Sequence, residues 1–376
     1  MPAHWHRIGS LLGGVNGISE ATAGRVAEST NRVLLAGIIR CMLGGLMIMV
    51  NGAAFAQASN PQPSKPSLID KTVNFIVGMP PGGNVDAYAR LVQRHLPRFM
   101  KGVPTIVVQN KPGAGSLLSV LAVANSSPSD GVVMGTFSSS LIPDAIAEPE
   151  HFKVDFRHFG FVGAVGEDYR VCYVRSESGI HDLKQLAARD NVVFSASAAG
   201  TSGNLNLAIL KDLFKIKLKE VLGYQGSAAK RLAFERGEVD GDCGGLEAIP
   251  TAWLSEHKIN IVTRFLPNLV APVDQSVPFA GDLLHDGADR ALYDFLIKPG
   301  RMLGTLLVSD KTPKEKLDEL RHSFDAMVVD QQFLADAQQT GLGVTPIAGA
   351  AIEQEISQLY ATPAPVLARA RVLLKE

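Results

Sequence analysis

Between residues 73 and 137 the chain alternates short apolar runs with helical patterns, and this alternation constrains the fold more than any other feature. The runs 73–78, 105–108 and 132–137 are rich in valine, isoleucine and phenylalanine. The segment 85–99 has apolar residues at helical spacing, and 116–125 is apolar nearly all round. Strands buried on both faces read as continuous apolar runs, so this β-α-β-α-β order predicts a parallel sheet covered by helices.

The same alternation returns further along the chain. Two more strands are expected at 161–165 and 170–174, and a second set of strands and helices at 191–243. A strand at 302–308 precedes a long helical segment that runs to residue 374. The sequence therefore predicts the α/β fold class, with two α/β units and a helical C-terminal part.

The N-terminal part has the features of an export signal. Arg32 and Arg40 precede the apolar run 41–50, and Ala54, Phe55 and Ala56 form the A-x-A pattern of a cleavage site. A membrane anchor is the competing interpretation, but ten apolar residues fall short of the roughly 20 that span a bilayer. We expect a signal peptide at 1–56, a Pro/Ser-rich linker at 57–67, and a periplasmic location for the mature chain.

Composition excludes some functions and leaves others open. Without residues 1–56 the chain keeps 32 Lys/Arg and 35 Asp/Glu, so it lacks the basic excess typical of nucleic-acid binding. Cys172 and Cys243 remain, and their spacing does not distinguish a disulfide from two separate buried thiols. The absence of C-x-x-C excludes a zinc ribbon and a thioredoxin-type site.

Motifs of common enzymes are also missing. The sequence has no phosphate-binding P-loop, no G-x-S-x-G, no H-E-x-x-H and no G-x-G-x-x-G. The histidines are scattered without metal-ligand spacing. We therefore predict no catalytic residue, no metal and no cofactor. An acid–base enzyme that uses Asp86 or Asp242 stays open, because catalytic partners meet in space rather than along the chain.

Loops of small residues that open helices recur instead. They occur at 79–84, at 195–204 and at 226–227, and a run of serines ends the strand at 132–137. The start of a helix leaves about four N–H groups without intrahelical partners and carries partial positive charge, which favours anions. Each loop alone is more often an ordinary cap or turn than a binding site, but together the loops indicate an anionic ligand between two domains.

The candidate ligand-binding residues follow from these loops. Backbone N–H groups are expected to act at the glycines and hydroxyls at Ser and Thr, while Asp86 is interpreted as helix support beside the ligand. The first-domain candidates are Met79, Pro81, Gly82, Gly83, Asn84, Asp86, Ser138 and Ser139. The second-domain candidates are Ala198, Gly200, Thr201, Ser202, Tyr224, Ser227 and Asp242.

Five segments occur in the order found in one known family. They are 80–86 (PPGGNVD), 107–115 (VVQNKPGAG), 194–205 (FSASAAGTSGNL), 224–228 (YQGSA) and 311–313 (KTP). Over roughly residues 68–360 the chain resembles the substrate-binding proteins of tripartite tricarboxylate transporters, the Bug (Bordetella uptake gene) family. It departs from that pattern at Met79, where phenylalanine is common, at Asn204, where histidine is frequent, and at 242–245.

This resemblance implies a two-domain periplasmic binding protein of type II-like fold, with a ligand cleft between the domains. Domain 1 would comprise 68–169 plus 293–376, and domain 2 would comprise 170–292. The implied ligand is a small carboxylate: a di- or tricarboxylate, an amino acid or an aromatic acid. The implied partners are the membrane permease subunits of such a transporter, and the protein is expected to be a monomer that binds no nucleic acid.

Two other functions remain open at this stage. One is a periplasmic enzyme acting on a small carboxylate, and the other is a ligand-sensing module for a receptor kinase. The sequence does not separate a sensor from a transport protein, because both would bind the ligand in the same way.

Overall fold

The computed structural model describes residues 72–127, 131–196, 202–224, 226–268 and 270–375. The chain divides into two compact units, Met1–Pro63 and Ser64–Glu376, and every described residue belongs to the second. The expected signal peptide at 1–56 and linker at 57–67 lie outside the described residues, so both stay predictions.

The first sheet has six strands. Its order is β11-β4-β10-β3-β1-β2, and β1 pairs in parallel with both β2 and β3. β10 lies between β3 and β4 and is antiparallel to both. The strands are β1 (Thr72–Val77), β2 (Thr105–Asn110), β3 (Val132–Thr136), β4 (Phe159–Gly166), β10 (Leu303–Ser309) and β11 (Ile347–Ala348). The parallel β1, β2 and β3 are the predicted runs.

The second sheet has five strands in the order β7-β6-β8-β5-β9. β6 is parallel to β7 and β8, whereas β5 is antiparallel to β8 and β9. The strands are β5 (Arg170–Arg175), β6 (Val192–Ser195), β7 (Leu218–Val221), β8 (Gly241–Gly245) and β9 (Ile259–Arg264). Together the two mixed sheets confirm the predicted α/β fold class.

A disulfide joins two strands of the second sheet. Cys172 of β5 lies directly opposite Cys243 of β8, and the two residues form a disulfide with a Cα–Cα distance of 4.1 Å. The sequence left a disulfide and two separate thiols open, and the register of β5 on β8 decides between them.

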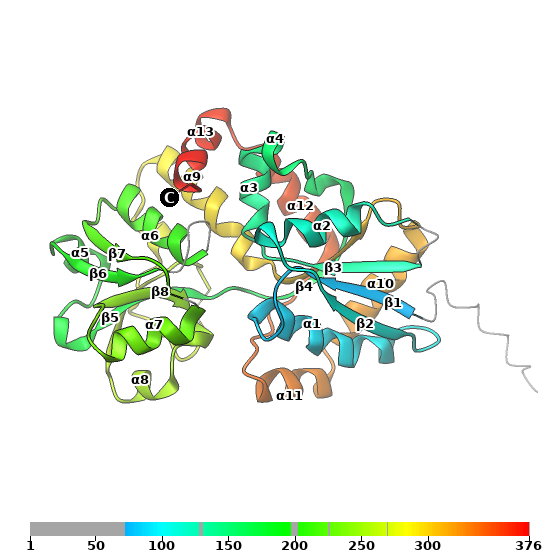
Figure 1. Ribbon diagram of the computed structural model, residues 1–376, viewed down its shortest axis with the longest axis horizontal. Helices are drawn as coiled ribbons and strands as arrows, with labels where there is room; N and C mark the ends of the chain where they lie inside the picture. Colours follow the sequence, from blue (N-terminus) through cyan, green and yellow to red (C-terminus); the bar gives the residue numbers. More distant parts are fainter. Residues whose placement is uncertain (1–71, 128–130, 197–201, 225, 269, 376) are drawn as a thin grey trace, which may run out of the picture. The chain divides into compact units, whose positions relative to one another are not determined.

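Helices cover both faces of the first sheet. Helix α1 packs with Phe75 and Val77 of β1, while α2 packs with Ile76 on the opposite face. Figure 1 shows α1 and α2 on opposite sides of this sheet. The α-helices are α1 (Asn84–His95), α2 (Leu117–Ala124), α3 (Leu141–Ala147), α4 (Pro149–Phe152), α5 (Leu183–Ala187), α6 (Ser202–Asp212), α7 (Gly226–Glu235), α8 (Thr251–Ser255), α9 (Gly287–Ile297), α10 (Lys314–Met327), α11 (Gln331–Gln339), α12 (Gly349–Tyr360) and α13 (Ala364–Leu373).

Two predicted helices are shorter than expected because of proline. The helix expected at 85–99 ends as α1 at His95, and the 3-10 helix η1 (Leu96–Phe99) follows with Pro97 near its start. Proline lacks the backbone N–H that continues an α-helix. Pro363 likewise divides the expected C-terminal helix into α12 and α13. The remaining 3-10 helices are η2 (Ala114–Ser116), η4 (Phe156–His158), η5 (Ser176–Ser178), η6 (Leu246–Ala248), η7 (Ala280–Leu283) and η8 (Lys298–Arg301).

The C-terminal helix α13 contacts helices from distant parts of the chain. Arg369 bonds to Asp289 of α9 at 2.7 Å and to Asp212 of α6 at 3.2 Å, and Arg371 donates to the carbonyl oxygen of Ala147 in α3. In this way α13 connects helices associated with both sheets.

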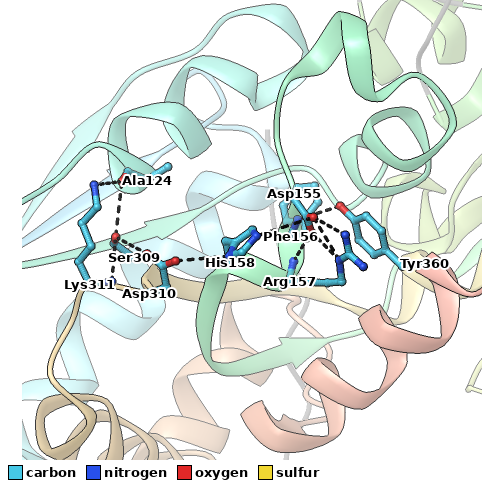
Figure 2. A network of polar contacts seen from close by, with 9 residues as sticks. All are labelled: Ala124, Asp155, Phe156, Arg157, His158, Ser309, Asp310, Lys311 and Tyr360. Carbon is cyan, nitrogen blue, oxygen red and sulfur yellow. Dashed lines mark hydrogen bonds and ion pairs between the residues drawn. The ribbon is translucent and has the colours of Figure 1, made fainter.

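A polar network attaches α12 to the start of β4 (Figure 2). The backbone N–H of Phe156 donates to Tyr360 Oη at 2.8 Å, and the Arg157 guanidinium lies 4.4 Å from the centre of the Tyr360 ring. Arg157 also pairs with Asp155, while His158 lies 3.6 Å from Asp310 at the end of β10. The network therefore ties η4, α12 and the β10–α10 loop together.

Asp144, a carboxyl on α3, predicts a pH dependence of stability. Burial, followed by the charge of Glu148, raises its pKa to about 7. Between about pH 4 and pH 7 the unfolded chain loses a proton that the folded protein keeps, so stability falls as pH rises through this window. Asp144→Asn should therefore raise Tm at pH 8 but not at pH 4. The corresponding gain in unfolding free energy at pH 8 is at most about 4 kcal/mol.

Thermal unfolding at the two pH values measures the effect. Asp286 is the control, because hydrogen bonds from the backbone N–H groups of Asp289 and Ala288 lower its pKa. The ionised Asp286 carboxylate therefore stabilises the folded protein at pH values above the pKa that this group has in the unfolded chain. Asp286→Ala should lower Tm at pH 8. An equal gain for Asp144→Asn at both pH values would contradict the assignment of the pH dependence to this carboxyl.

Candidate functional site

A cavity of about 690 Å³ lies where elements of the two sheets meet. Its lining includes the loop after β1, the serines before α3, the beginnings of α6 and α7, and the segments that connect the sheets. The described lining residues are 79–85, 138–140, Asp168, Arg170, Leu205, Asn206, Gly226, Glu247, Phe265, Leu266, Leu296, Ile297, Pro299, Gly300 and Leu303.

The buried carboxylate of Asp86 stabilises the conformation of the loop 79–84. Its carboxylate accepts hydrogen bonds from Gly82 N at 2.9 Å, from Arg90 Nε at 2.9 Å and from Asn110 Nδ2 at 2.7 Å. The side chain is only 2% exposed and does not line the cavity. Burial opposes its charge, but the bonds from Arg90, Asn110 and Gly82 outweigh burial and lower the pKa of Asp86. The carboxylate is therefore engaged in shaping the loop.

The loop itself depends on a glycine in the left-handed region. Gly82 has φ +82°, which most other residues adopt only with strain, and its N–H donates to Asp86 Oδ2. Met79, Pro81, Gly82, Gly83 and Asn84, all candidates from the sequence, line the cavity. Gly83 is the N-cap of α1 and has no side chain to satisfy the helix start.

The serine run before α3 is tied to this loop through Ser116, which sequence reasoning did not select. Ser116 Oγ donates to Gly78 O at 3.2 Å and accepts from Ser138 N at 3.1 Å. Ser138 and Ser139 line the cavity as candidates, together with Ser140, whose Oγ lies 2.8 Å from Ser138 Oγ. Serine is too common in turns for Ser116 to stand out in the sequence.

The second-domain candidates are distributed differently. Ala198, Gly200 and Thr201 lie outside the described residues, and Ser202 is the first residue of α6. Ser227, in the first turn of α7, follows the cavity-lining Gly226, whereas Tyr224 packs against a hydrophobic cluster of the second sheet. Ser227 and Tyr224 are not among the residues that line the cavity.

Asp242 is buried in a salt bridge rather than placed at the cavity surface. Its Oδ1 accepts from Lys230 Nζ at 2.8 Å and from Ser195 Oγ at 2.9 Å. These bonds connect β8 with α7 and β6. The structure thus gives Asp242 partners within the protein and does not bring it into the cavity lining.

Three charged residues of the lining were missed by sequence reasoning. Arg170 Nη1 donates to Asp168 Oδ2 at 3.1 Å. Glu247 Oε1 accepts from Asn84 Nδ2 at 3.2 Å, a contact between η6 and the start of α1. Burial, and then the charge of Asp168, raise the pKa of Glu247. No motif marks these residues, because Asn84 and Glu247 become neighbours of the 168–170 segment only in the fold.

Much of the remaining lining is apolar. Phe265, Leu266, Leu296 and Ile297 come from the segments that follow β9 and form α9, and Leu205 comes from α6. Trp253 is not part of this lining, since it packs 4.7 Å from Phe234 between ring centres in another cluster. The cavity therefore combines polar loops and charged groups with an apolar wall.

The described residues contain no group of three or more His, Cys, Asp or Glu arranged to hold a metal ion. No helix in the described part is both long enough and apolar enough to cross a membrane.

The chain is similar in sequence to proteins of known name. No family model matches it. It is 30% identical, over 206 residues, to a UPF0065 protein from the tcbD–tcbE intergenic region of Pseudomonas sp. strain P51, a match covering 54% of this chain and 58% of that protein. It is 27% identical over 216 residues to the protein BugT of Bordetella pertussis, covering 54% and 62%. The chain is thus similar in sequence to a Bug protein. The predicted resemblance is confirmed, although the chain spans less than two thirds of the curated relatives it matches.

Solved structures share the fold. A TctC solute-binding protein from Polaromonas has a TM-score of 0.62 at 18% identity, with 79% of this chain and 98% of that one covered. The periplasmic binding protein BugD gives 0.58 at 19% identity, covering 81% and 98%. MatC from Rhodopseudomonas palustris, solved with malate, gives 0.57 at 21% identity, covering 79% and 98%. The expected periplasmic binding protein fold is confirmed.

The buried pair of Lys230 and Asp242 generates a stability prediction. Both side chains are about 8% exposed, so Lys230→Met would leave a buried carboxylate without its cation. We expect a loss of about 3–5 kcal/mol of unfolding free energy, measured by urea unfolding. The double variant Lys230→Met, Asp242→Leu should recover part of that loss, because it removes both charges.

Lys258→Met is the matched control. Lys258 pairs with Glu256 on the surface, where both side chains are 56% exposed, and such pairs contribute little. A Lys230→Met variant as stable as Lys258→Met would contradict the structural role given to Asp242.

Proposed function

We propose that this Bug relative is an exported, non-catalytic solute-binding protein that captures a small carboxylate in the 690 Å³ cavity. The permease subunits of a tripartite tricarboxylate transporter would receive the ligand. One observation carries the proposal: the loop 79–84, the serines 138–140 and the starts of α6 and α7 converge on one cavity.

The chemistry of these elements suits an anion. The beginnings of α1, α6 and α7 leave N–H groups without intrahelical acceptors and carry partial positive charge. Gly83 adds no side chain to the start of α1, so an anion can approach the backbone there. Ser138 and Ser139 add hydroxyl donors from the neighbouring loop. We infer that the carboxylate is held by backbone and hydroxyl groups.

The proteins of similar fold support this ligand class. MatC was solved with malate, and another R. palustris protein, Rpa4515, was solved with adipate. Both ligands are dicarboxylates. Transfer of a carboxylate ligand to this chain is our proposal, and it agrees with the polar loops that line the cavity.

An enzymatic role through Asp86 or Asp242 is disfavoured by their surroundings. Asp86 already accepts hydrogen bonds from three donors, Gly82 in the loop, Arg90 on α1 and Asn110 on β2. Asp242 is paired with Lys230. Neither carboxylate lines the cavity, so neither is placed to abstract a proton from a molecule bound there.

We also propose that the two parts of the protein close on the ligand. Domain 1 would comprise 68–169 plus 293–376 and domain 2 would comprise 170–292, as predicted from the sequence. Closure would shift an equilibrium between open and closed forms through differential ligand affinity. The Asn84–Glu247 hydrogen bond would belong to the closed form, because it joins residues of the two proposed domains. The protein would act as a monomer in the periplasm.

A ligand screen tests the proposal directly. We expect at least one of malate, adipate, citrate, glutamate and benzoate to raise Tm, because a ligand at 100 times its Kd stabilises the folded state by about 2.7 kcal/mol. Differential scanning fluorimetry with the mature chain measures the shift. If none of these acids binds while one is chemically converted, the binding-protein proposal is wrong.

Gly83→Leu tests the position of the ligand. Gly83 has φ −81°, and an added Cβ would have Pro80 O at 3.6 Å as its nearest contact, so the fold accommodates a side chain there. That side chain would block the approach of a ligand to the backbone of the loop 79–84. We expect at least a 100-fold loss of ligand affinity with little change in the Tm of the unliganded protein. Calorimetric titration with the acid selected by the screen gives the affinity.

Gly287→Leu is the control for this substitution. Gly287 opens α9, has open space around an added Cβ and does not line the cavity. Its affinity should equal that of the wild type. Normal affinity in Gly83→Leu would remove the loop 79–84 from the binding site.

A further inference from the structure

Two donor groups in the cavity wall have no partner among the described residues. Asn206 is 1% exposed, and its Nδ2 is buried without a hydrogen-bond acceptor. Arg170 Nε is also buried without an acceptor. Both residues line the cavity, Asn206 from α6 and Arg170 from the start of β5. Because folded proteins rarely leave buried donors unsatisfied, each of these groups calls for an acceptor that the described residues do not supply.

The two side chains come from one region of the fold. A Cβ added to Gly203 would lie 3.6 Å from Arg170 Nη2, so the guanidinium packs against the first turn of α6. Residues 203 and 206 are three apart on this helix and therefore share a face. Arg170 and Asn206 thus flank the beginning of the same helix, where the backbone adds partial positive charge.

Arg170 keeps donors available although it is paired. Asp168 accepts from Nη1 only, and a guanidinium has five N–H donors and stays charged at all ordinary pH values. Among the described residues that line the cavity, Arg170 is the only cation, and Asp168 and Glu247 are the acidic groups. Glu247 is occupied by the bond from Asn84 Nδ2, and its pKa is raised by burial and by Asp168.

This balance limits the charge of the ligand. One cation beside two carboxyl groups suits a ligand that presents a single carboxylate at this point, and it disfavours a compact trianion. Phe265, Leu266 and Leu296 supply apolar surface in the same cavity, which suits a carbon body rather than further charges.

We propose that Arg170 and Asn206 form a carboxylate subsite at the start of α6 and select acids with an apolar carbon body over citrate. This inference deepens the proposed function and rests on it. The carboxylate would accept hydrogen bonds from Arg170 and from Asn206 Nδ2, and the carbon body would pack on the apolar wall. Arg170 and Asn206 are therefore specificity-determining residues of this chain.

Three variants of the mature chain test the subsite. Asn206→Asp keeps the size of the side chain but replaces the donor by a carboxylate, Arg170→Gln removes the cation, and Arg170→Lys keeps the charge but loses the planar fork. Gln338→Glu, an exposed amide-to-acid change on α11 outside the cavity, is the matched control. Unliganded Tm and circular dichroism establish that each variant is folded.

Isothermal titration calorimetry is carried out with malate, adipate, citrate, glutamate and benzoate, and with adipamide and benzamide as neutral counterparts. In the wild type we expect adipate or benzoate to bind at least 10-fold more tightly than citrate and than its own amide. Asn206→Asp and Arg170→Gln should each weaken the best acid at least 100-fold and remove the preference for acid over amide. Arg170→Lys should lose about 10-fold, and Gln338→Glu should bind as the wild type does.

The outcomes separate this inference from the proposed function. If the wild type binds an acid and both Asn206→Asp and Arg170→Gln bind it within threefold, the subsite is refuted while the binding function stands. If citrate is the tightest ligand of the wild type, the selectivity is refuted. If the wild type binds none of the acids, the proposed function fails and this inference fails with it. Should Arg170→Gln not fold, Asn206→Asp and Arg170→Lys decide the question by the same criteria.

Discussion

The shape of the loop 79–84 depends on one buried carboxylate. Asp86 receives hydrogen bonds from Gly82 N, Arg90 and Asn110, and Asn110 also donates to Met79 O at 2.9 Å. These bonds fix both ends of the loop between β1 and α1 to the neighbouring strand β2. A loop containing two prolines and two glycines has no regular hydrogen-bond pattern of its own, so its shape must be imposed by side chains. The carboxylate acts here as an internal acceptor rather than as a reagent.

Sequence reasoning predicted those parts of the molecule that depend on local pattern. The strands β1, β2 and β3 are continuous apolar runs, and the loop 79–84 was recognised because small residues open a helix there. The helix end at His95 was placed too late because apolar spacing continues through Pro97. The pairing of Cys172 with Cys243 could not be predicted, since it depends on the register of two strands that are far apart in sequence.

Arg170, Glu247 and Asn206 of the candidate site could not be selected from the sequence, because their neighbours are distant along the chain. Arg170 begins an ordinary strand, Glu247 lies in a short 3-10 helix, and Asn206 lies within α6. None belongs to a motif, and each acquires a role only through neighbours from another element. Asp242 illustrates the converse, because it was a candidate for ligand binding and is instead bonded to Lys230 and Ser195. The sequence pattern predicts where the loops lie, whereas the charge balance of a cavity depends on the tertiary structure.

The place of β10 in the first sheet has a consequence for how the chain acquires its structure. β10 lies between β3 and β4, yet its residues follow those of the entire second sheet. During synthesis the first sheet therefore stays incomplete until β10 and then β11, which ends at Ala348, have emerged, whereas all strands of the second sheet are present by residue 264. Sheets that pair such distant segments form slowly, because the chain loses entropy on closing the long loop before the stabilising contacts form. The larger sheet is therefore completed last, after every strand of the second sheet is available for pairing.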